Sequence, residues 1–370
     1  MSVAINGTNG ITYNDGSLQP SAPVGRNLII NGDMAIDQRN VGASVATGAG
    51  AFTYTLDRYF YYASQASKYT VQQNAGAVTP PAGFTKYLGV TSTSAYSIVA
   101  TDIFIVGQKI EGLNIADLGW GTANAKTVTL SFQVYSSLTG TFGGSLQNGA
   151  ANRAYPFTYT IDSANTWTSI SVTIAGDTSG TWLTTNGIGI YVNLGLGVGS
   201  TYSGSAGSWS ANQYWSATGA TSVVGTSGAT LYITGVQLEV NTTATPFEHL
   251  QYTTQLQLCQ RYFEKSYSIG SPIPTGTALG SVSLFTSYSA NSYMVGSRPF
   301  VVSKRAAPTI IIYSPSGTAG TIADGNTTNL GAGAANQIGT AGFALQNTSG
   351  GVITPAGNLI YFHFTASAEL

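Results

Sequence analysis

Few side chains in this sequence could do catalytic chemistry. The 370 residues include two histidines, His249 and His363, and one cysteine, Cys259. A Ser-His-Asp triad needs a histidine in a cleft, and a zinc site needs several His or Cys ligands close together. We expect His249 to hold a turn before a helix, and His363 to lie in a strand opposite apolar neighbours. We therefore predict no catalytic residue and no cofactor.

Paired carboxylates are a second source of chemistry, because two of them could hydrolyse a glycosidic bond. The chain has 14 acidic residues, and many stand beside turn residues, where an Asp ordinarily caps or turns the chain. Asp57 precedes Arg58, and we expect an ion pair there. Glu111 stands near Lys109, and we expect another. We interpret the carboxylates as structural and predict that the protein is not an enzyme.

Aromatic side chains offer better binding chemistry, because sugar rings stack on them while sugar hydroxyls pair with amides and carboxylates. Residues 199–230 are rich in Ser, Gly and Trp, with few Leu, Ile or Val to bury a ring. The rings that we predict to bind a glycan are Tyr202, Trp209, Tyr214 and Trp215. The alternative is that they pack on the sheet or on a neighbouring subunit. A second ring cluster, at 54 and 59–62, is expected mainly in strand and interface packing.

The composition restricts the class of partner. Charged residues make up 7% of the chain and the formal net charge is −1, without any basic stripe for nucleic acid or basic cluster for an anionic membrane. A single cysteine excludes an intrachain disulfide. Residues 1–25 lack the regions of a signal peptide, and no apolar run is long enough to span a membrane. We expect no nucleic-acid partner and no membrane insertion.

Period-two alternation is the main structural signal, and it predicts half-buried strands. Apolar residues occupy every second position in four segments: Val128–Val134, Ile170–Ile174, Ile188–Val198 and Ile360–Phe364. In the first of these, Ser131 and Gln133 stand on the opposite, polar face. In the third, glycines fill much of the opposite face, so another backbone could approach it closely.

One stretch breaks this pattern and predicts a helix. Residues 253–262 lack Gly and Pro, and Leu256, Cys259 and Phe263 follow at helical spacing, with Thr253 or Thr254 as the cap. We predict an all-β fold of two antiparallel, jelly-roll-like β-sandwich domains joined by one short helix. The predicted parts are an N-terminal attachment segment (1–26), a first domain (27–249), a helical linker (250–264) and a second domain (265–370).

Several motifs resemble those of known families. Residues 27–34 (NLIINGDM) with Gln38-Arg39 resemble the opening of jelly-roll modules related to carbohydrate-binding modules. Segments 107–112, 128–132, 166–168 and 231–239 match later strands of that family. Residues 244–249 (ATPFEH) and 258–263 (LCQRYF) resemble a junction common in tailed-phage virion proteins, which 305–309 (RAAPT) and 364–370 (FTASAEL) continue. The resemblance covers about residues 27–370, and the insertion at 199–230 departs from it.

The resemblance implies a virion protein of the tail-fibre type that binds a host-surface glycan and acts at the particle surface. It also implies a homotrimer, and it leaves open whether a structural calcium is bound, since the sequence shows no dense Asp/Asn loop. Residues 1–26 are expected to bind other virion proteins, because Ile11 and Tyr13 alternate like an edge strand.

The alternative function is purely architectural: capsid decoration, collar or fibre shaft. A depolymerase is a third, less favoured reading.

Overall fold

The computed structural model describes residues 27–285, 294–324, 328–348 and 359–370, together with three short strands nearer the N-terminus. These strands, β1 (Ala4–Asn6), β2 (Gly10–Thr12) and β3 (Leu18–Gln19), form an antiparallel sheet in the order β1-β2-β3. Ile11 pairs with Ile5 on one side and Gln19 on the other. The expectation of an edge strand at Ile11 is therefore wrong, since β2 is the middle strand, and Tyr13 lies outside the described residues.

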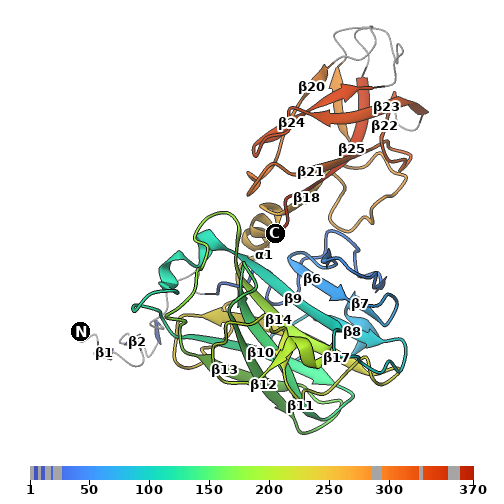
Figure 1. Cartoon of the computed structure of the whole chain (residues 1–370). Coiled ribbons are helices and arrows are strands. Elements are labelled where there is room, and N and C mark those ends of the chain that lie inside the picture. The colour runs from blue at the N-terminus through green and yellow to red at the C-terminus, as the bar shows by residue number, and fades with distance from the viewer. Residues whose placement is uncertain are drawn as a thin grey trace.

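The first domain is a sandwich of two six-stranded antiparallel sheets (Figure 1). The sheet that we call the front sheet has the order β13 (Thr168–Ile174), β10 (Val128–Ser136), β17 (Thr230–Glu239), β8 (Leu88–Ser92), β7 (Tyr69–Gln73) and β4 (Val45–Ala46). The back sheet has the order β12 (Ala154–Ile161), β11 (Gly140–Asn148), β14 (Ile188–Val198), β9 (Ile103–Glu111), β6 (Tyr59–Ala63) and β5 (Thr53–Tyr54). Single-turn helices η1 to η4 lie at Ala75–Ala77, Gly112–Asn114, Ala116–Leu118 and Ser200–Tyr202.

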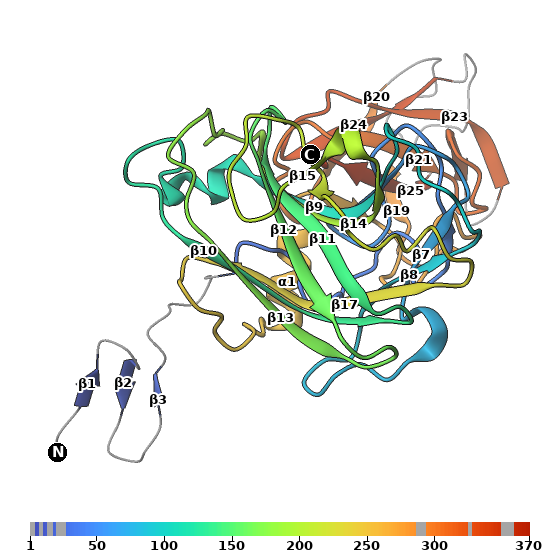
Figure 2. The same cartoon turned by 60° about the horizontal axis from the view of Figure 1, so that its bottom comes forward.

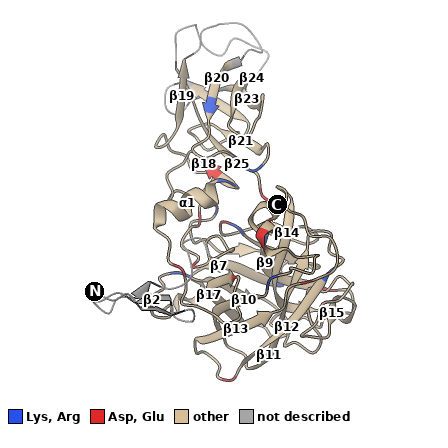
Figure 3. Cartoon of the chain, turned by 90° about the vertical axis from the view of Figure 1, so that its left-hand side faces the viewer, with Lys and Arg blue, Asp and Glu red and all other residues tan. Residues whose placement is uncertain are grey.

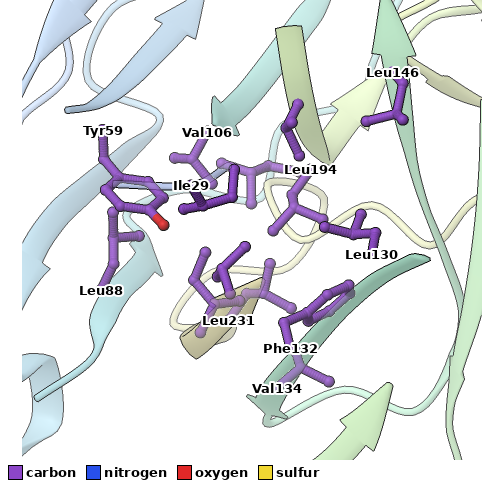
Figure 4. Close-up of a cluster of buried hydrophobic side chains, with 14 of the residues drawn as sticks. Ile29, Tyr59, Leu88, Val106, Leu130, Phe132, Val134, Leu146, Leu194 and Leu231 are labelled. Carbon is purple, nitrogen blue, oxygen red and sulfur yellow. The ribbon is translucent and has the colours of Figure 1, made fainter. Parts of the chain in front are cut away.

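The core lies between these sheets, and the predicted alternation builds it. Val128, Leu130 and Val134 of β10 are fully buried and meet side chains of the back sheet such as Val106 and Leu194 (Figure 4). Each strand presents one apolar face inward, because successive side chains point to opposite faces. This burial removes the apolar surface from water and is the main source of stability.

The alternation predicted for β14 is correct in the middle of the strand and wrong at its ends. Ile190, Leu194 and Leu196 lie in the core, but Ile188 and Val198 pack with the rings on the outer face of the back sheet. The pairing of β14 with β9 shifts register between Ile188 and Ile190 and again between Gly195 and Gly197. Each irregularity reverses the face of the residues beyond it.

The predicted helix is α1 (Tyr252–Gln260), which leads almost directly into β18 (Phe263–Lys265). Thr253 and Thr254 stand inside its first turn, so the predicted cap is wrong; Gln251 precedes the helix without a side-chain capping bond. The buried face carries Gln255 and Cys259, while Leu258 is 37% exposed. Among the described residues, none of the helices has the length and apolar character that crossing a lipid bilayer requires.

The second domain is antiparallel and has its own core. Its sheet has the order β18, β25 (Leu359–Ser367), β22 (Thr321–Asp324), β23 (Thr328–Asn336), β24 (Gly342–Asn347) and β20 (Met294–Pro299), with β19 (Val282–Phe285) and β21 (Thr309–Tyr313) also pairing with β25. Ile360, Phe362 and Phe364 are fully buried, as their alternation predicts. The protein is thus all-β, with two antiparallel β-sandwich domains joined by one short helix.

Candidate functional site

The ring of Trp215 lies in a buried cluster on the outer face of the back sheet. It is 4% exposed and packs with Phe52, Phe60 and Tyr191. Its neighbour Ser216 belongs to the two-residue strand β16 (Ser216–Ala217), which pairs in parallel with β15 (Ser203–Gly204). The expectation that Trp215 is exposed for stacking on a sugar is wrong, because residues of the insertion cover the sheet instead of projecting from it.

Glycines in the back sheet explain how the insertion at 199–230 packs so closely against the outer face of that sheet. A Cβ atom on Gly143 would lie 2.5 Å from the hydroxyl of Ser216, and one on Gly195 would lie 2.6 Å from it. Only glycine therefore leaves room for this strand. The chain's own insertion covers the glycine face of β14, with the Ser216 side chain against Gly195, and its backbone comes closest at Gly143 of the neighbouring strand β11, where a Cβ atom would lie 2.9 Å from the backbone nitrogen of Ala217.

The other three predicted rings also have partners within the domain. Trp209 is half-buried between Trp120, Trp182 and Tyr155, and its indole N–H donates to the carbonyl of Ala175 at 2.8 Å. Tyr202 packs against the cluster around Trp215. Tyr214 covers Gly204. Ligand contact by Tyr202, Trp209 and Tyr214 stays a prediction, but the structure does not bring the four rings together into one open platform.

The outer face of the front sheet carries a groove of about 460 Å³ that the sequence prediction missed. Its floor comes from β10, β13 and β17, and its wall from a loop at 82–84 and the segment 244–249. The residues that line it are Ala82, Phe84, Ser131, Phe132, Gln133, Ser169, Ile170, Ser171, Gly235, Ala244, Thr245, Pro246, Phe247 and His249. None of these residues is an acid, a lysine or an arginine, so the groove combines apolar side chains with uncharged polar groups.

Hydroxyl and amide groups form the floor of the groove. Gln133 on β10 and Ser169 on β13 stand directly opposite each other and exchange hydrogen bonds of 2.8 and 3.0 Å. Ser131 and Ser171 form the next pair along the same strands. These side chains point outward because their neighbours in each strand point into the core. The alternation could have located this polar surface, but nothing in the sequence showed which loops would wall it.

Three rings form the wall. The centroid of Phe247 lies 5.2 Å from that of Phe84 and 4.9 Å from that of His249, in edge-to-face contacts. The backbone of this wall is fixed to the front sheet, since Thr245 donates its N–H to Glu239 at 2.8 Å. His249 is exposed and packs beside the two phenylalanine rings, in a loop that ends before α1.

Gly235 allows Phe84 to lie on the sheet. The pairing of β10 with β17 shifts register between Ser131 and Gln133, which marks a β-bulge, and Gly235 has a φ of +63° there. A Cβ atom at this position would lie 2.6 Å from the Phe84 ring. Both the left-handed backbone and the close approach of the ring therefore need glycine.

The second histidine and the cysteine have structural surroundings. His363 is fully buried, stacks on Tyr267 at 3.8 Å and lies within hydrogen-bond distance of Ser266 and the Thr277 carbonyl. Burial lowers the pKa of His363 below its usual value. Cys259 is buried on α1. In the part of the chain that the structure describes, no group of three or more His, Cys, Asp or Glu side chains could hold a metal ion.

Charged residues from distant parts of the chain meet where the two domains join, near α1 and the C-terminal end (Figure 3). Glu369 accepts hydrogen bonds from Arg58, which is 1% exposed, and from Arg39 at 2.9 Å. The Arg58 guanidinium also lies 3.5 Å over the ring of Tyr262. We call this set, together with Glu111 and Arg261, the junction cluster.

The ion pairs of the junction cluster differ from those expected from neighbours in the sequence. Arg58 pairs with Glu369 instead of Asp57, and Glu111 pairs with Arg261 in two bonds of 2.9 and 2.7 Å instead of with Lys109. Burial alone would raise the pKa of the Glu111 carboxyl, but the bonds from Arg261 and Tyr262 hold it below its usual value. Residues of the motifs 258–263 and 364–370 therefore meet at this joint, whereas the motif 244–249 forms the wall of the groove.

Comparisons with known proteins give fold-level neighbours only. No family model matches the sequence, and no curated protein matches it. A putative sugar-binding protein from Bacteroides thetaiotaomicron aligns with 58% of this chain and 100% of its own, at 13% identity and a TM-score of 0.31. A family 11 carbohydrate-binding module from Clostridium thermocellum, in complex with a mixed-linked tetrasaccharide, aligns with 56% of this chain and 98% of its own, at 10% identity and a TM-score of 0.27.

The enzymatically active domain of tailspike protein 4 from bacteriophage CBA120 aligns with 58% of this chain at 12% identity and a TM-score of 0.30. This chain covers 22% of that protein's length. At these identities and TM-scores, similarity does not assign a function to the chain, and the groove has to be judged by its own chemistry.

Proposed function

We propose that this protein is a non-enzymatic component of a phage virion appendage that binds an uncharged host-surface glycan in the groove of the front sheet. The observation that supports binding is the lining of the groove: hydroxyls and an amide on the floor, aromatic rings on the wall, and no charged side chain. Sugars combine apolar C–H faces with hydroxyls, so they match such a surface. An anionic glycan would lose hydration there without meeting a cation, which disfavours it.

The glycan proposal is tested with purified protein on an array of neutral and acidic glycans, followed by calorimetry with the best binder. Phe247→Ala removes a wall ring and should weaken binding about tenfold, equivalent to about 1.4 kcal/mol. Tyr252→Ala is the matched control, because this ring is 52% exposed on α1 and does not line the groove. Its dissociation constant should equal that of the unmodified protein.

A second variant separates a loss of glycan binding from a loss of folding. Phe247 also packs near Gly32, so its loss could loosen the domain. Gln133→Ala removes only a partly exposed amide from the floor, and it should weaken binding while leaving the melting temperature nearly unchanged. Glycan binding that survives both substitutions would exclude the groove as the site, and failure of every glycan to bind would contradict the proposal itself.

The second candidate is a purely architectural virion protein. It is favoured by the junction cluster, in which residues of the phage-like motifs 258–263 and 364–370 form a joint between the domains, and by the packing of the predicted rings inside the first domain. Particles carrying Gln133→Ala would separate the two functions. Normal adsorption to host cells, combined with normal particle assembly, would support the architectural function.

Attachment to other virion proteins is proposed for residues 1–26. A chain lacking these residues should keep both folded domains, because the described core residues all lie beyond them. It should fail to enter particles. Incorporation at the normal level would refute this assignment.

A further inference from the structure

We propose that β13 is a self-pairing edge, through which two copies of this chain join their front sheets about a two-fold axis. β13 is the outermost strand of the front sheet and, among the described residues, pairs only with β10 (Figure 2). The outward-facing amide and carbonyl groups of such a strand form a template for another strand. A seven-residue strand offers several of these groups.

The other edges of the first domain are protected, and β13 is not. β4 and β5 are only two residues long. β12 contains Pro156, whose carbonyl accepts the N–H of Gly207 at 2.9 Å, and Ala154 pairs with Ser210, so the insertion covers this edge. β13 contains no proline, no charge and no bulge in its pairing with β10. Exposed edges usually carry one of these features, which prevent pairing with another chain.

The sequence of β13, TSISVTI, is complementary to itself when it is reversed about its centre. An antiparallel pair centred on Ser171 sets Ile170 opposite Val172 and Ser169 opposite Thr173. Thr168 then faces Ile174. The branched apolar side chains of Ile170 and Val172 meet on the inner face, and the hydroxyls of Ser169 and Thr173 meet on the outer face, which are favourable cross-strand pairs. This symmetry identifies a second copy of the chain, rather than an unrelated strand, as the partner.

A two-fold axis perpendicular to the sheet leaves both sandwiches on the same side of the joined sheets. Ile170 and Val172, which are only partly buried at the edge, would then be covered by the partner. Such an interface is isologous and closes after two copies. Because Ser169 and Ser171 also line the groove, the two grooves would lie next to each other across the axis.

Charge substitution at the centre of the pair tests this interface. Ser171 is exposed, so Ser171→Lys and Ser171→Glu should fold, yet each would place like charges opposite each other. Light scattering should give the mass of two chains for the unmodified protein and one chain for either variant. An equimolar mixture of the two variants should recover two chains. Ser163→Lys, at an exposed turn before β13, is the matched control and should stay dimeric.

Several results would overturn the proposal. The first is that the unmodified protein is a monomer. The second is that neither variant changes the mass of the assembly. The third is that a mixture of the two variants stays monomeric. A mass of three chains that Ser171→Lys leaves unchanged would point instead to the threefold assembly expected from the family resemblance. Cooperative thermal unfolding of both variants would establish that a loss of mass is not a loss of fold.

Discussion

At the scale of single residues, Asp57 shows how a buried charge links the fold to pH. Its carboxylate is fully buried and accepts the backbone N–H and the side-chain amide of Gln38, each at 2.6 Å. Burial raises the pKa of Asp57 from 3.8 to about 6, and the nearby Arg39 charge and the Gln38 bonds offset only part of this effect. Above pH 6 both the folded and unfolded chains are ionised, so the folded state carries the full cost of the buried charge.

As the pH falls from about 6 to about 4, folded Asp57 takes up a proton while the unfolded chain stays ionised, so the group's net contribution to stability rises. The free energy of unfolding of the unmodified protein, relative to that of Asp57→Asn, should therefore increase on the order of 3 kcal/mol between pH 7 and pH 4. Urea unfolding of both proteins across this range measures the difference. Parallel curves would show that Asp57 has an ordinary pKa.

Trp215 makes a second prediction at this scale. Because the ring is 4% exposed and packed among Phe52, Phe60 and Tyr191, Trp215→Ala should cost about 3–5 kcal/mol of stability, as large-to-small substitutions in a core do. Chemical denaturation measures this loss. Trp215→Phe, which keeps a ring in the cluster, should recover much of it. An unchanged midpoint for Trp215→Ala would restore the earlier expectation of an exposed, ligand-binding ring.

At the scale of elements, the β-bulge at Gly235 fixes the wall of the groove. Gly235→Ala would place a methyl group against Phe84 in a left-handed backbone, so the ring or the strand must shift. We expect a loss of about 1–3 kcal/mol in stability and weaker glycan binding. Calorimetry and thermal unfolding check both results. Gly219→Ala also has a positive φ but meets no neighbouring atom, so it should cost stability without changing affinity.

The sequence predicted the strands and the helix well but did not reveal the groove of the front sheet, for a physical reason. Alternation along one strand is local, so it revealed which side chains of β10, β13 and β25 face a core. The groove depends on contacts between residues as distant as Phe84 and Phe247, and no local pattern encodes them. The packing of the rings at 199–230 was hidden for the same reason, because Phe52, which contacts Trp215, and Trp120, which contacts Trp209, lie far away in the sequence.

Local sequence patterns also fail to predict the ion pairs. Arg58 was expected to pair with Asp57, its neighbour in the sequence, yet its partner is Glu369, more than 300 residues along the chain. Asp57 and Arg58 lie in the turn between β5 and β6, where Arg58 has a φ of +72°, so the local turn geometry sets the direction of each side chain and the sequence does not reveal it. The polar face of β10 was visible in its alternation, but the sequence alone could not show that it lies beneath a wall of rings.

At the scale of the whole molecule, the junction cluster couples the two sandwiches. Glu369 follows the last strand of the second domain and bridges Arg39 and Arg58 of the first. Arg305 reinforces the joint by donating to the carbonyls of Asn186 and Glu369, each at 2.7 Å. Arg58 is almost fully buried, and in the part of the chain that the structure describes its ion pair is with Glu369, so we expect the two domains to unfold as one unit.

Glu369→Gln tests this coupling. It leaves the Arg58 guanidinium buried without its counter-ion, which should cost about 3–5 kcal/mol. Asp117→Asn, which breaks the exposed pair with Lys126, is the control and should cost about 0–1 kcal/mol. Tryptophan fluorescence reports the unfolding of the first domain, because all five tryptophans lie between residues 120 and 215. Far-UV circular dichroism reports the unfolding of both domains.

In the unmodified protein the two signals should follow one denaturation curve, since coincident probes indicate a single cooperative transition. In Glu369→Gln the curves should separate, because the weakened joint lets one sandwich unfold before the other. Separate curves in the unmodified protein would mean that the domains are independent despite the cluster. Coincident curves in Glu369→Gln, shifted no further than in Asp117→Asn, would mean that the buried ion pair does not hold the domains together.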